Sequence, residues 1–187
     1  MELTSLGIDG AWLVTSLVHA DERGSFREWF KFDDIKSATG LDFSVAQANL
    51  SESRRGVVRG IHYSLASAGQ AKLVTCISGK ILDVIVDIRP KSPTFRQHVK
   101  VELAGGSGHV ALIGAGLGHG FISLEDNSFV AYLITSKFSP IEEYEINPLD
   151  PELDINWILP NHELLLSPKD LAAPALHELQ SLFQLPN

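Results

Sequence analysis

The stretch from Arg54 to Gly79 contains the densest set of residues that could do chemistry. It carries three arginines, one histidine (His62) and one lysine (Lys72) among β-branched apolar residues. The histidine and the lysine lie ten residues apart, a spacing that suits two neighbouring strands whose side chains alternate between faces. We therefore predict a site with a base at His62 and a fixed cation at Lys72.

A lone histidine on a strand is more often structural than catalytic, so a catalytic role for His62 requires a partner side chain. His62 follows Gly60, which permits close approach of the backbone, and Ile61, which we expect on the opposite face of the strand. A carboxylate on the other ring nitrogen would fix the tautomer and support the imidazolium. Asp170, in the motif SPKDLAAP, is the main candidate for that carboxylate. Its alternative roles are an N-cap of the tail or a solvated loop acid.

Three further side chains allow both a functional and a structural interpretation. Lys72 lies between apolar neighbours, so its ammonium either reaches outward to solvent or serves a bound anion. His119, flanked by glycines in GAGLGHGFISL, could donate to a ligand or cap a turn. Tyr132 alternates with Val130 and Ile134 and is either a core residue or an acid that faces His62 across the interior. Both interpretations of Tyr132 predict burial.

A metal site is a separate possibility for a small β-rich protein with histidines. Metal-binding cupins show two histidines one residue apart, followed by a glutamate. Here Tyr63 and Ser64 follow His62, and no glutamate occurs between His62 and Glu102. A three- or four-ligand shell cannot be assembled locally, so we expect neither a catalytic metal nor another cofactor.

Length and composition set the broad class. The 187 residues fit one domain, long enough to bury about 70% of the surface of the unfolded chain. The net charge of −8 argues against nucleic acid as the main partner, whereas a local arginine pocket could still bind a small anion. The N-terminus has no signal-peptide pattern and no run of 18 apolar residues occurs. With Cys76 as the sole cysteine, expected to be a buried hydrophobe, we predict a soluble cytoplasmic protein without membrane contact.

Most of the chain reads as short strands separated by Gly, Ser, Pro and Asp turns, a pattern typical of a β-sandwich or barrel. A jelly roll is the best single prediction. One short helix is expected at 33–39, with Asp33 as N-cap and Gly40 just beyond its end. The expected strands are Ala11–His19, Ser25–Phe32, Phe43–Leu50, Gly56–Tyr63, Ala71–Ile77, Ile81–Ile88, His98–Leu103, His109–Ile113, Gly120–Leu124 and Phe129–Thr135.

After Pro140 the pattern changes to a Pro- and Asp-rich coil, expected to pack over the barrel. Its large apolar residues would cost about 1.5–3 kcal/mol each if left in water. A packing helix is expected from Pro174 to Leu185. The apolar residues expected to be covered are Trp157, Ile158, Leu164, Leu165 and Leu166.

Together these stretches resemble the dTDP-4-dehydrorhamnose 3,5-epimerase family, a metal-free branch of the cupin-like jelly rolls. The matching motifs occur in the order of the family and cover about four-fifths of the chain. They are DERGSFREWF (21–30), QANLSESRRGVVRGIHY (47–63), GQAKLV (69–74), GKILDVIVDIRPKSPTF (79–95), GLGHGF (116–121), AYLITSKFSP (131–140), and DPELDINW with LLSPKDLAAPAL towards the end.

The resemblance implies a fold, a reaction and a set of roles. It implies a single jelly-roll epimerase domain that inverts the carbons flanking the ketone of a dTDP-linked 4-keto-6-deoxyhexose. His62 would be the base oriented by Asp170, Lys72 would stabilise the enolate, and Tyr132 would be the acid on the opposite face. Further matches to family positions that bind the substrate are Gln47, Asn49, Arg59, His119 and Phe138.

The resemblance also implies a homodimer. Arg23, Phe26 and Glu28 match a segment that in this family reaches the nucleotide bound to the partner subunit. The N-terminal segment of about 1–32 is therefore expected to contact that subunit, and the C-terminal coil and helix of about 141–187 to pack on the barrel.

Departures from the family pattern keep two alternatives open. Many members carry a tyrosine where this chain has Phe138, and others differ at Ser64, the LASAG loop and Leu133. Phenylalanine can stack on a base but cannot donate a hydrogen bond or a proton, so inversion of a single carbon is the first alternative. A sugar-nucleotide binder without catalysis is the second, although the base, the acid and the orienting carboxylate are all present.

Overall fold

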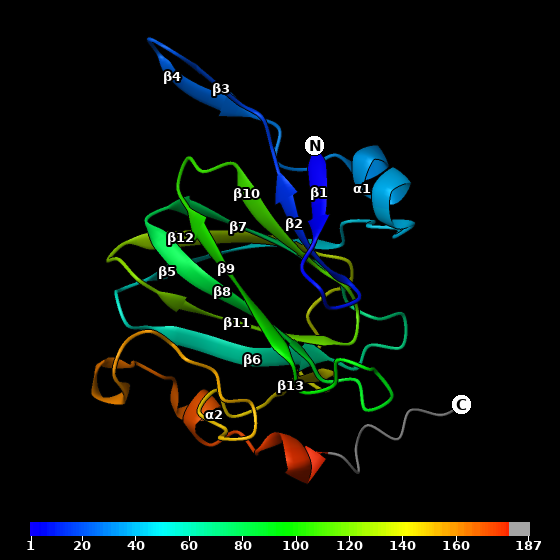
Figure 1. Ribbon diagram of the computed structural model, residues 1–187, viewed down its shortest axis with the longest axis vertical. Helices are drawn as coiled ribbons and strands as arrows, with labels where there is room; N and C mark the ends of the chain where they lie inside the picture. Colours follow the sequence, from blue (N-terminus) through cyan, green and yellow to red (C-terminus); the bar gives the residue numbers. More distant parts are fainter. Residues whose placement is uncertain (180–187) are drawn as a thin grey trace.

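The computed structural model describes residues 1–179, which form two antiparallel sheets packed face to face (Figure 1). The first sheet has the strand order β1-β2-β10-β7-β12-β5 and the second β13-β6-β11-β8-β9. The strands of the first sheet are β1 Glu2–Ser5, β2 Ala11–Thr15, β5 Gln47–Ser53, β7 Lys72–Ser78, β10 His109–Ile113 and β12 Ser128–Ile134. Those of the second are β6 Val58–Ser64, β8 Lys80–Asp87, β9 His98–Ala104, β11 Leu117–Ser123 and β13 Glu143–Glu145.

The main core lies between the two sheets. Alternate residues of each strand point inward, and on β7 and β12 these are Val74, Cys76 and Val130, all 0% exposed. They meet Ile85 and Phe121 from β8 and β11 in one apolar cluster. The arrangement confirms the predicted all-β jelly-roll class, and the interior position of Cys76 confirms its interpretation as a buried hydrophobe.

Several predicted boundaries differ from the structure. The stretch 11–19 is two strands, β2 and β3 (Val18–Asp21), and 43–46 lies before β5 rather than in it. The short strands β1 and β13 were not predicted, because neither contains a run of β-branched or aromatic residues. Helix α1 runs Phe32–Thr39 with Lys31 as N-cap, so Asp33 lies in the first turn and the predicted cap was wrong. Gly40 ends the helix at φ 73°, as predicted.

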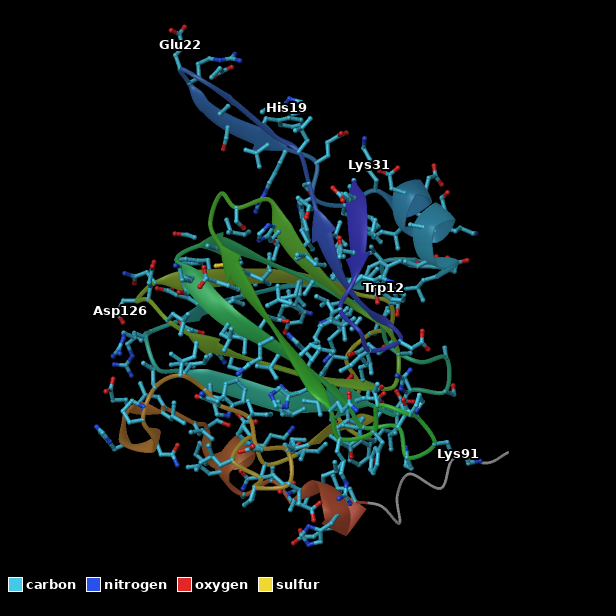
Figure 2. All side chains as sticks on the ribbon, in the orientation of Figure 1. Trp12, His19, Glu22, Lys31, Lys91 and Asp126 are labelled. Atoms are coloured by element: carbon cyan, nitrogen blue, oxygen red, sulfur yellow. The ribbon has the colours of Figure 1, made fainter. Side chains whose placement is uncertain are left out.

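A two-stranded hairpin projects from the body of the molecule. It comprises β3 and β4 (Gly24–Arg27) and extends away from both sheets in Figure 1. Figure 2 shows Glu22 at its tip and His19 along its length, both far from the core. Leu17, just before the hairpin, and Phe26 on β4 are 72% and 66% exposed, and large apolar side chains exposed on one arm are typical of an interaction surface.

The C-terminal coil lies over the outer face of the second sheet (Figure 1). Trp157 and Leu164 are buried there and Leu166 packs against the same cluster. Ile158 and Leu165 are instead 58% and 45% exposed, so their predicted burial was wrong. Each follows a buried residue, Trp157 or Leu164, and of these two neighbouring side chains only the first points inward.

Short helical turns complete this region: η1 Asn161–Glu163, α2 Pro168–Leu171 and η2 Leu176–Leu179. Of the helix predicted for 174–185, residues 174–175 are not helical and 176–179 form the 3-10 turn η2, whereas 180–185 lie outside the described residues. No helix within residues 1–179 is long and apolar enough to cross a lipid bilayer.

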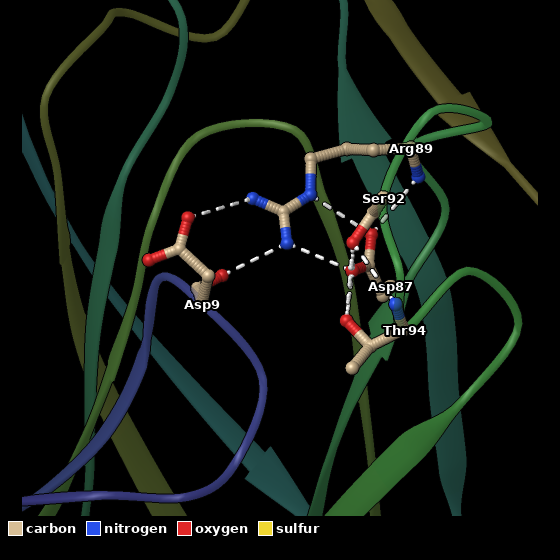
Figure 3. A network of polar contacts seen from close by, with 5 residues as sticks. All are labelled: Asp9, Asp87, Arg89, Ser92 and Thr94. Atoms are coloured by element: carbon tan, nitrogen blue, oxygen red, sulfur yellow. Dashed lines mark hydrogen bonds and ion pairs between the residues drawn. The ribbon is translucent and has the colours of Figure 1, made fainter.

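A buried carboxylate fastens the end of β8 to the β1–β2 loop (Figure 3). Asp87, 0% exposed, accepts hydrogen bonds from the Arg89 guanidinium and from the hydroxyls of Ser92 and Thr94. The same guanidinium donates to the backbone oxygen of Asp9 at 2.9 Å. Burial raises the pKa of Asp87, but these donors outweigh it and hold that pKa well below its usual range.

Candidate active site

Glycines allow the strand that carries His62 to approach its neighbour closely. Gly60 on β6 has φ 126°, and a Cβ there would meet the Cα of Gly120 on β11 at 2.5 Å. Neither strand could hold a side chain at this crossing, so the predicted close approach at Gly60 is confirmed. The register of β6 and β11 then places His62 directly opposite His119.

The carboxylate predicted to orient His62 is in place. Asp170 Oδ1 lies 2.7 Å from His62 Nε2, although 108 residues separate them. Burial raises the pKa of Asp170, but the hydrogen bonds and charge of His62, with Ser167, lower it overall. Because the ionised carboxylate can only accept, Nε2 carries a proton, and in the neutral imidazole the lone pair is then on Nδ1.

Ser167 and helix α2 hold that carboxylate rigidly. The Ser167 hydroxyl donates to Asp170 Oδ2 at 2.8 Å and accepts from the Asp170 backbone N–H at 3.0 Å. Ser167 is therefore the N-cap of α2, and Asp170 is the third residue of that helix. The alternative in which Asp170 itself caps the tail is wrong.

Lys72 enters the same space from the first sheet. It opens β7, is 8% exposed, and its Nζ lies 3.5 Å from the backbone oxygen of His62. Burial lowers the pKa of Lys72, while the carboxylates of Glu143 and Asp83 act in the opposite direction. The side chain points into the protein rather than to solvent, so the alternative in which the ammonium reaches outward is wrong.

Tyr132 and the polar residues of β5 form the facing wall. Tyr132 pairs with Asn49 across β12 and β5 and is only partly buried, so its predicted burial is incomplete. The burial it has raises the pKa of its phenol. Gln47 Nε2 donates to Asn49 Oδ1 at 2.7 Å, and Gln47 Oε1 accepts from the backbone N–H of Phe138 at 2.9 Å. Arg59 donates to the Ser53 hydroxyl and thereby spans from β6 to β5.

These side chains surround one cavity of about 420 Å³, within the range of small-molecule sites. Residues of both sheets and of α2 line this cavity. The predicted site residues among them are Gln47, Asn49, Arg59, His62, Lys72, Tyr132, Phe138 and Asp170. The residues that sequence reasoning missed are Gln70, Ile134, Glu143, Tyr144, Ser167 and Lys169. Lys169 and Gln70 were close to predicted residues in sequence, but Glu143 lies in a strand that carried no signal.

The chain matches a family of known proteins over most of its length. Residues 5–178 match the model of the family described as dTDP-4-dehydrorhamnose 3,5-epimerase. The chain belongs to the dTDP-4-dehydrorhamnose 3,5-epimerase family. It is therefore an isomerase of the carbohydrate-epimerase kind, and the jelly roll is the cupin-like one of that family.

Individual family members are similar over nearly their whole length. A dTDP-4-dehydro-6-deoxyglucose 3-epimerase of Streptomyces bikiniensis is 43% identical, covering 97% of this chain and 92% of the relative. A dTDP-4-dehydrorhamnose 3,5-epimerase of Streptomyces griseus is 44% identical, covering 97% and 90%. The crystal structure of dTDP-6-deoxy-D-glucose-3,5-epimerase from Legionella pneumophila, in complex with dTDP-4-keto-L-rhamnose, has a TM-score of 0.92 at 37% identity and covers 97% and 96%.

Four predicted residues of this family member do not line the cavity. His119 lies opposite His62 in the β6–β11 pairing, 9% exposed, with Nε2 2.7 Å from Asp83 Oδ2. Arg23, Phe26 and Glu28 lie on or just beyond the projecting hairpin, where Arg23 pairs with Asp21. One copy of the chain thus leaves these three residues outside its own cavity.

The histidines near the cavity are arranged in pairs with carboxylates. No group of three or more His, Cys, Asp or Glu side chains within residues 1–179 is arranged to hold a metal ion. Each histidine near the cavity is instead paired with one carboxylate, His62 with Asp170 and His119 with Asp83.

Proposed function

We propose that this protein epimerises a dTDP-linked 4-keto-6-deoxyhexose at both carbons that flank the ketone. The observation that carries the proposal is the placement of His62 and Tyr132 on opposing sheets, lining one cavity together with Lys72. A base and an acid on opposite walls can remove a proton from one face of a carbon and return one to the other face.

The proposed reaction begins when His62 Nδ1 takes a proton from a carbon next to the ketone. The C–H electron pair moves into the adjacent C–C bond and the carbonyl electrons move to oxygen, forming an enolate. The Lys72 ammonium stabilises that oxygen as a preorganised cation. The enolate then collapses and the carbon takes the phenol proton of Tyr132 from the other face. Burial raises the pKa of the Tyr132 phenol, so the phenol carries its proton at neutral pH and gives it up only to a strong base such as the enolate carbon. Water then takes the extra proton from the His62 imidazolium and returns a proton to the Tyr132 phenolate.

The other cavity residues are proposed to bind the substrate. Arg59 carries the fork of donors that suits a phosphate oxygen. Gln47 and Asn49 offer amide groups, and Phe138, 59% exposed at the mouth, offers a face on which a base can stack. His119, which pairs with His62 across β6 and β11, is proposed to bind the substrate as well.

We further infer a homodimer in which the hairpin of one subunit completes the cavity of the other. Support comes from the projection of β3–β4, the exposure of Phe26 and the position of Arg23 outside its own cavity. The sole cysteine, a free buried thiol, supports a reducing cytoplasmic location, with no proposed contact to nucleic acid or membrane.

Incubation with a dTDP-4-keto-6-deoxyhexose in heavy water tests the reaction. We expect deuterium at both carbons that flank the ketone. A complete absence of exchange, with neither carbon labelled, would exclude an epimerase and leave the binder without catalysis.

A single-carbon epimerase is the second candidate, favoured by one observation. Phe138 has no hydroxyl, so a proton or hydrogen bond from this position is unavailable, and the relatives include both 3-epimerases and 3,5-epimerases. Deuterium at one carbon only, with a second carbon labelled after Phe138→Tyr, would establish this alternative.

A further inference from the structure

Gln70 lines the cavity and joins the two sheets by hydrogen bonds. It lies two residues before Lys72, in line with β7, and is 6% exposed. Its Nε2 donates to the Ser136 hydroxyl at 3.0 Å and to Glu143 Oε1 at 2.8 Å. Ser136 follows β12 of the first sheet, whereas Glu143 opens β13 of the second. Both amide hydrogens are therefore used.

The backbone around Gln70 is fixed as well. The Ala71 N–H donates to the Thr135 hydroxyl at 2.9 Å, and the Thr135 N–H donates to the Ala71 oxygen at 3.1 Å. A buried amide on a fixed backbone has little freedom, so it holds its hydrogen-bond partners in a defined orientation. The Glu143 carboxylate is the charged partner, and it also lines the cavity.

Glu143 matters because it acts on the groups proposed to do the chemistry. Burial lowers the pKa of Lys72 and raises that of Tyr132, and the negative charge of Glu143 raises both. A carboxylate that is held in place by Gln70 favours the protonated ammonium of Lys72. That is the form in which Lys72 stabilises an enolate.

We propose that Gln70 is a positioning residue that fixes the Glu143 carboxylate and through it maintains the charge of Lys72. This inference rests on the proposed function, because it assigns a task to Lys72 in that reaction. The charged and titratable groups that act on Lys72 or share its cavity are Glu143 and Tyr144 on β13, Asp83 on β8 with its partner His119 on β11, Tyr132 on β12, Arg59 and His62 on β6, and Lys169 and Asp170 on α2.

The test is the pH dependence of deuterium exchange in Gln70→Leu, with Gln70→Met as a second variant should leucine prevent folding. Without the Gln70 hydrogen bond, the Glu143 carboxylate is no longer held in place and stabilises the ammonium less. Lys72 then loses its proton at a lower pH. We expect the alkaline limb of kcat to move down by about 1 pH unit. Ser136→Ala, which removes the other Gln70 hydrogen bond without touching Glu143, is the matched control and should leave that limb in place.

A double variant shows whether Gln70 acts through Glu143. In a Glu143→Gln background, whose alkaline limb is already lowered, Gln70→Leu should cause no additional shift. A merely structural role would instead lower stability or kcat/KM at every pH, with an unchanged limb and additive effects. An unchanged limb or additive effects would each overturn the inference.

A measurement without substrate separates this inference from the proposed function. The ε-carbon of Lys72, labelled with ¹³C and assigned with Lys72→Arg, can be titrated by NMR in the free protein. We expect its midpoint to fall in Gln70→Leu and to stay in Ser136→Ala. An unchanged midpoint in Gln70→Leu overturns the role of Gln70, whereas a wild-type protein that exchanges no deuterium overturns only the reaction.

Discussion

His62 has one ring nitrogen available for chemistry because the other donates to Asp170. This pairing sets the tautomer, and the Ser167 bond to the second carboxylate oxygen sets the orientation. In the proposed reaction, His62 takes the substrate proton at one ring nitrogen, while Asp170 holds the imidazole through the other.

His62→Asn removes the base while an amide of similar shape remains. We expect deuterium exchange to fall by about 10²- to 10⁴-fold, with nucleotide-sugar binding retained in calorimetry. An exchange rate near that of the wild type would contradict the role of His62 as the base. His98→Asn, on a strand away from the cavity, is the matched control.

Asp170→Asn keeps the hydrogen-bonding shape but offers the imidazole an amide in place of a charge. We expect kcat to fall by roughly 10²-fold or more, with KM little changed, because the imidazolium formed during proton transfer loses its stabilising partner. Asp154→Asn, outside the cavity, should have no effect on kcat. Equal losses in both variants would show that the Asp170 charge is not specific to the reaction.

At the scale of elements, the close crossing of β6 and β11 is what puts His62 and His119 side by side. Two glycines permit it, and the register shifts between His119 and Phe121 at the same point. Gly40, which ends α1, provides a comparison, since it also has a positive φ but a Cβ added there would meet nothing within 4 Å.

Gly60→Ala and Gly40→Ala separate backbone strain from collision. Gly40→Ala should cost about 1–2 kcal/mol of unfolding free energy from the left-handed conformation alone. Gly60→Ala adds contact with the Gly120 backbone, so we expect about 3 kcal/mol or more and a loss of exchange activity. Urea unfolding measures both, and equal costs would show that the β6–β11 approach is not constrained.

Two features concern the whole molecule: one ties distant parts of the chain together, and the other projects from the body. The Asp87 network ties the end of β8 to the β1–β2 loop, and the β3–β4 hairpin reaches away from the body (Figures 1 and 3). The first bears on stability and the second on assembly.

Asp87→Asn should lower the free energy of unfolding by about 3 kcal/mol, because the Arg89 guanidinium loses its buried counter-charge. The control Asp9→Asn removes a carboxylate that is 94% exposed and should cost less than about 1 kcal/mol. Chemical unfolding at neutral pH compares the two, and similar costs would contradict the importance of the buried pair.

The same carboxylate gives stability a defined pH dependence. Its pKa in the folded protein lies below the ordinary value of 3.8, so its contribution is complete above that value. It declines as pH falls from there towards the folded pKa. We expect the difference in stability between wild type and Asp87→Asn to be constant from pH 7 to about 5 and to shrink in stronger acid.

Mixing of two inactive variants tests assembly. One carries His62→Asn with an intact hairpin, and the other carries Arg23→Ala and Phe26→Ala with an intact His62. If the hairpin completes the cavity of the partner, a mixed dimer contains one whole site, and activity should return after joint refolding. No recovery, with mixed dimers present by mass spectrometry, would contradict the exchange of hairpins.

The sequence alone determined the class of fold, because short apolar runs between turn residues leave few ways to bury alternate side chains. It also pointed to His62, Lys72, Tyr132 and Asp170 through their motifs. Their convergence was decided only by tertiary structure: His62 and Asp170 are 108 residues apart and meet because the coil folds back onto β6. Glu143 and Gln70 became visible in the same way, since a three-residue strand paired with β6 has no periodicity of its own and the Gln70–Glu143 contact spans 73 residues. Local pattern reports which face of a strand is buried, but only the packing of two sheets decides which side chains share a cavity.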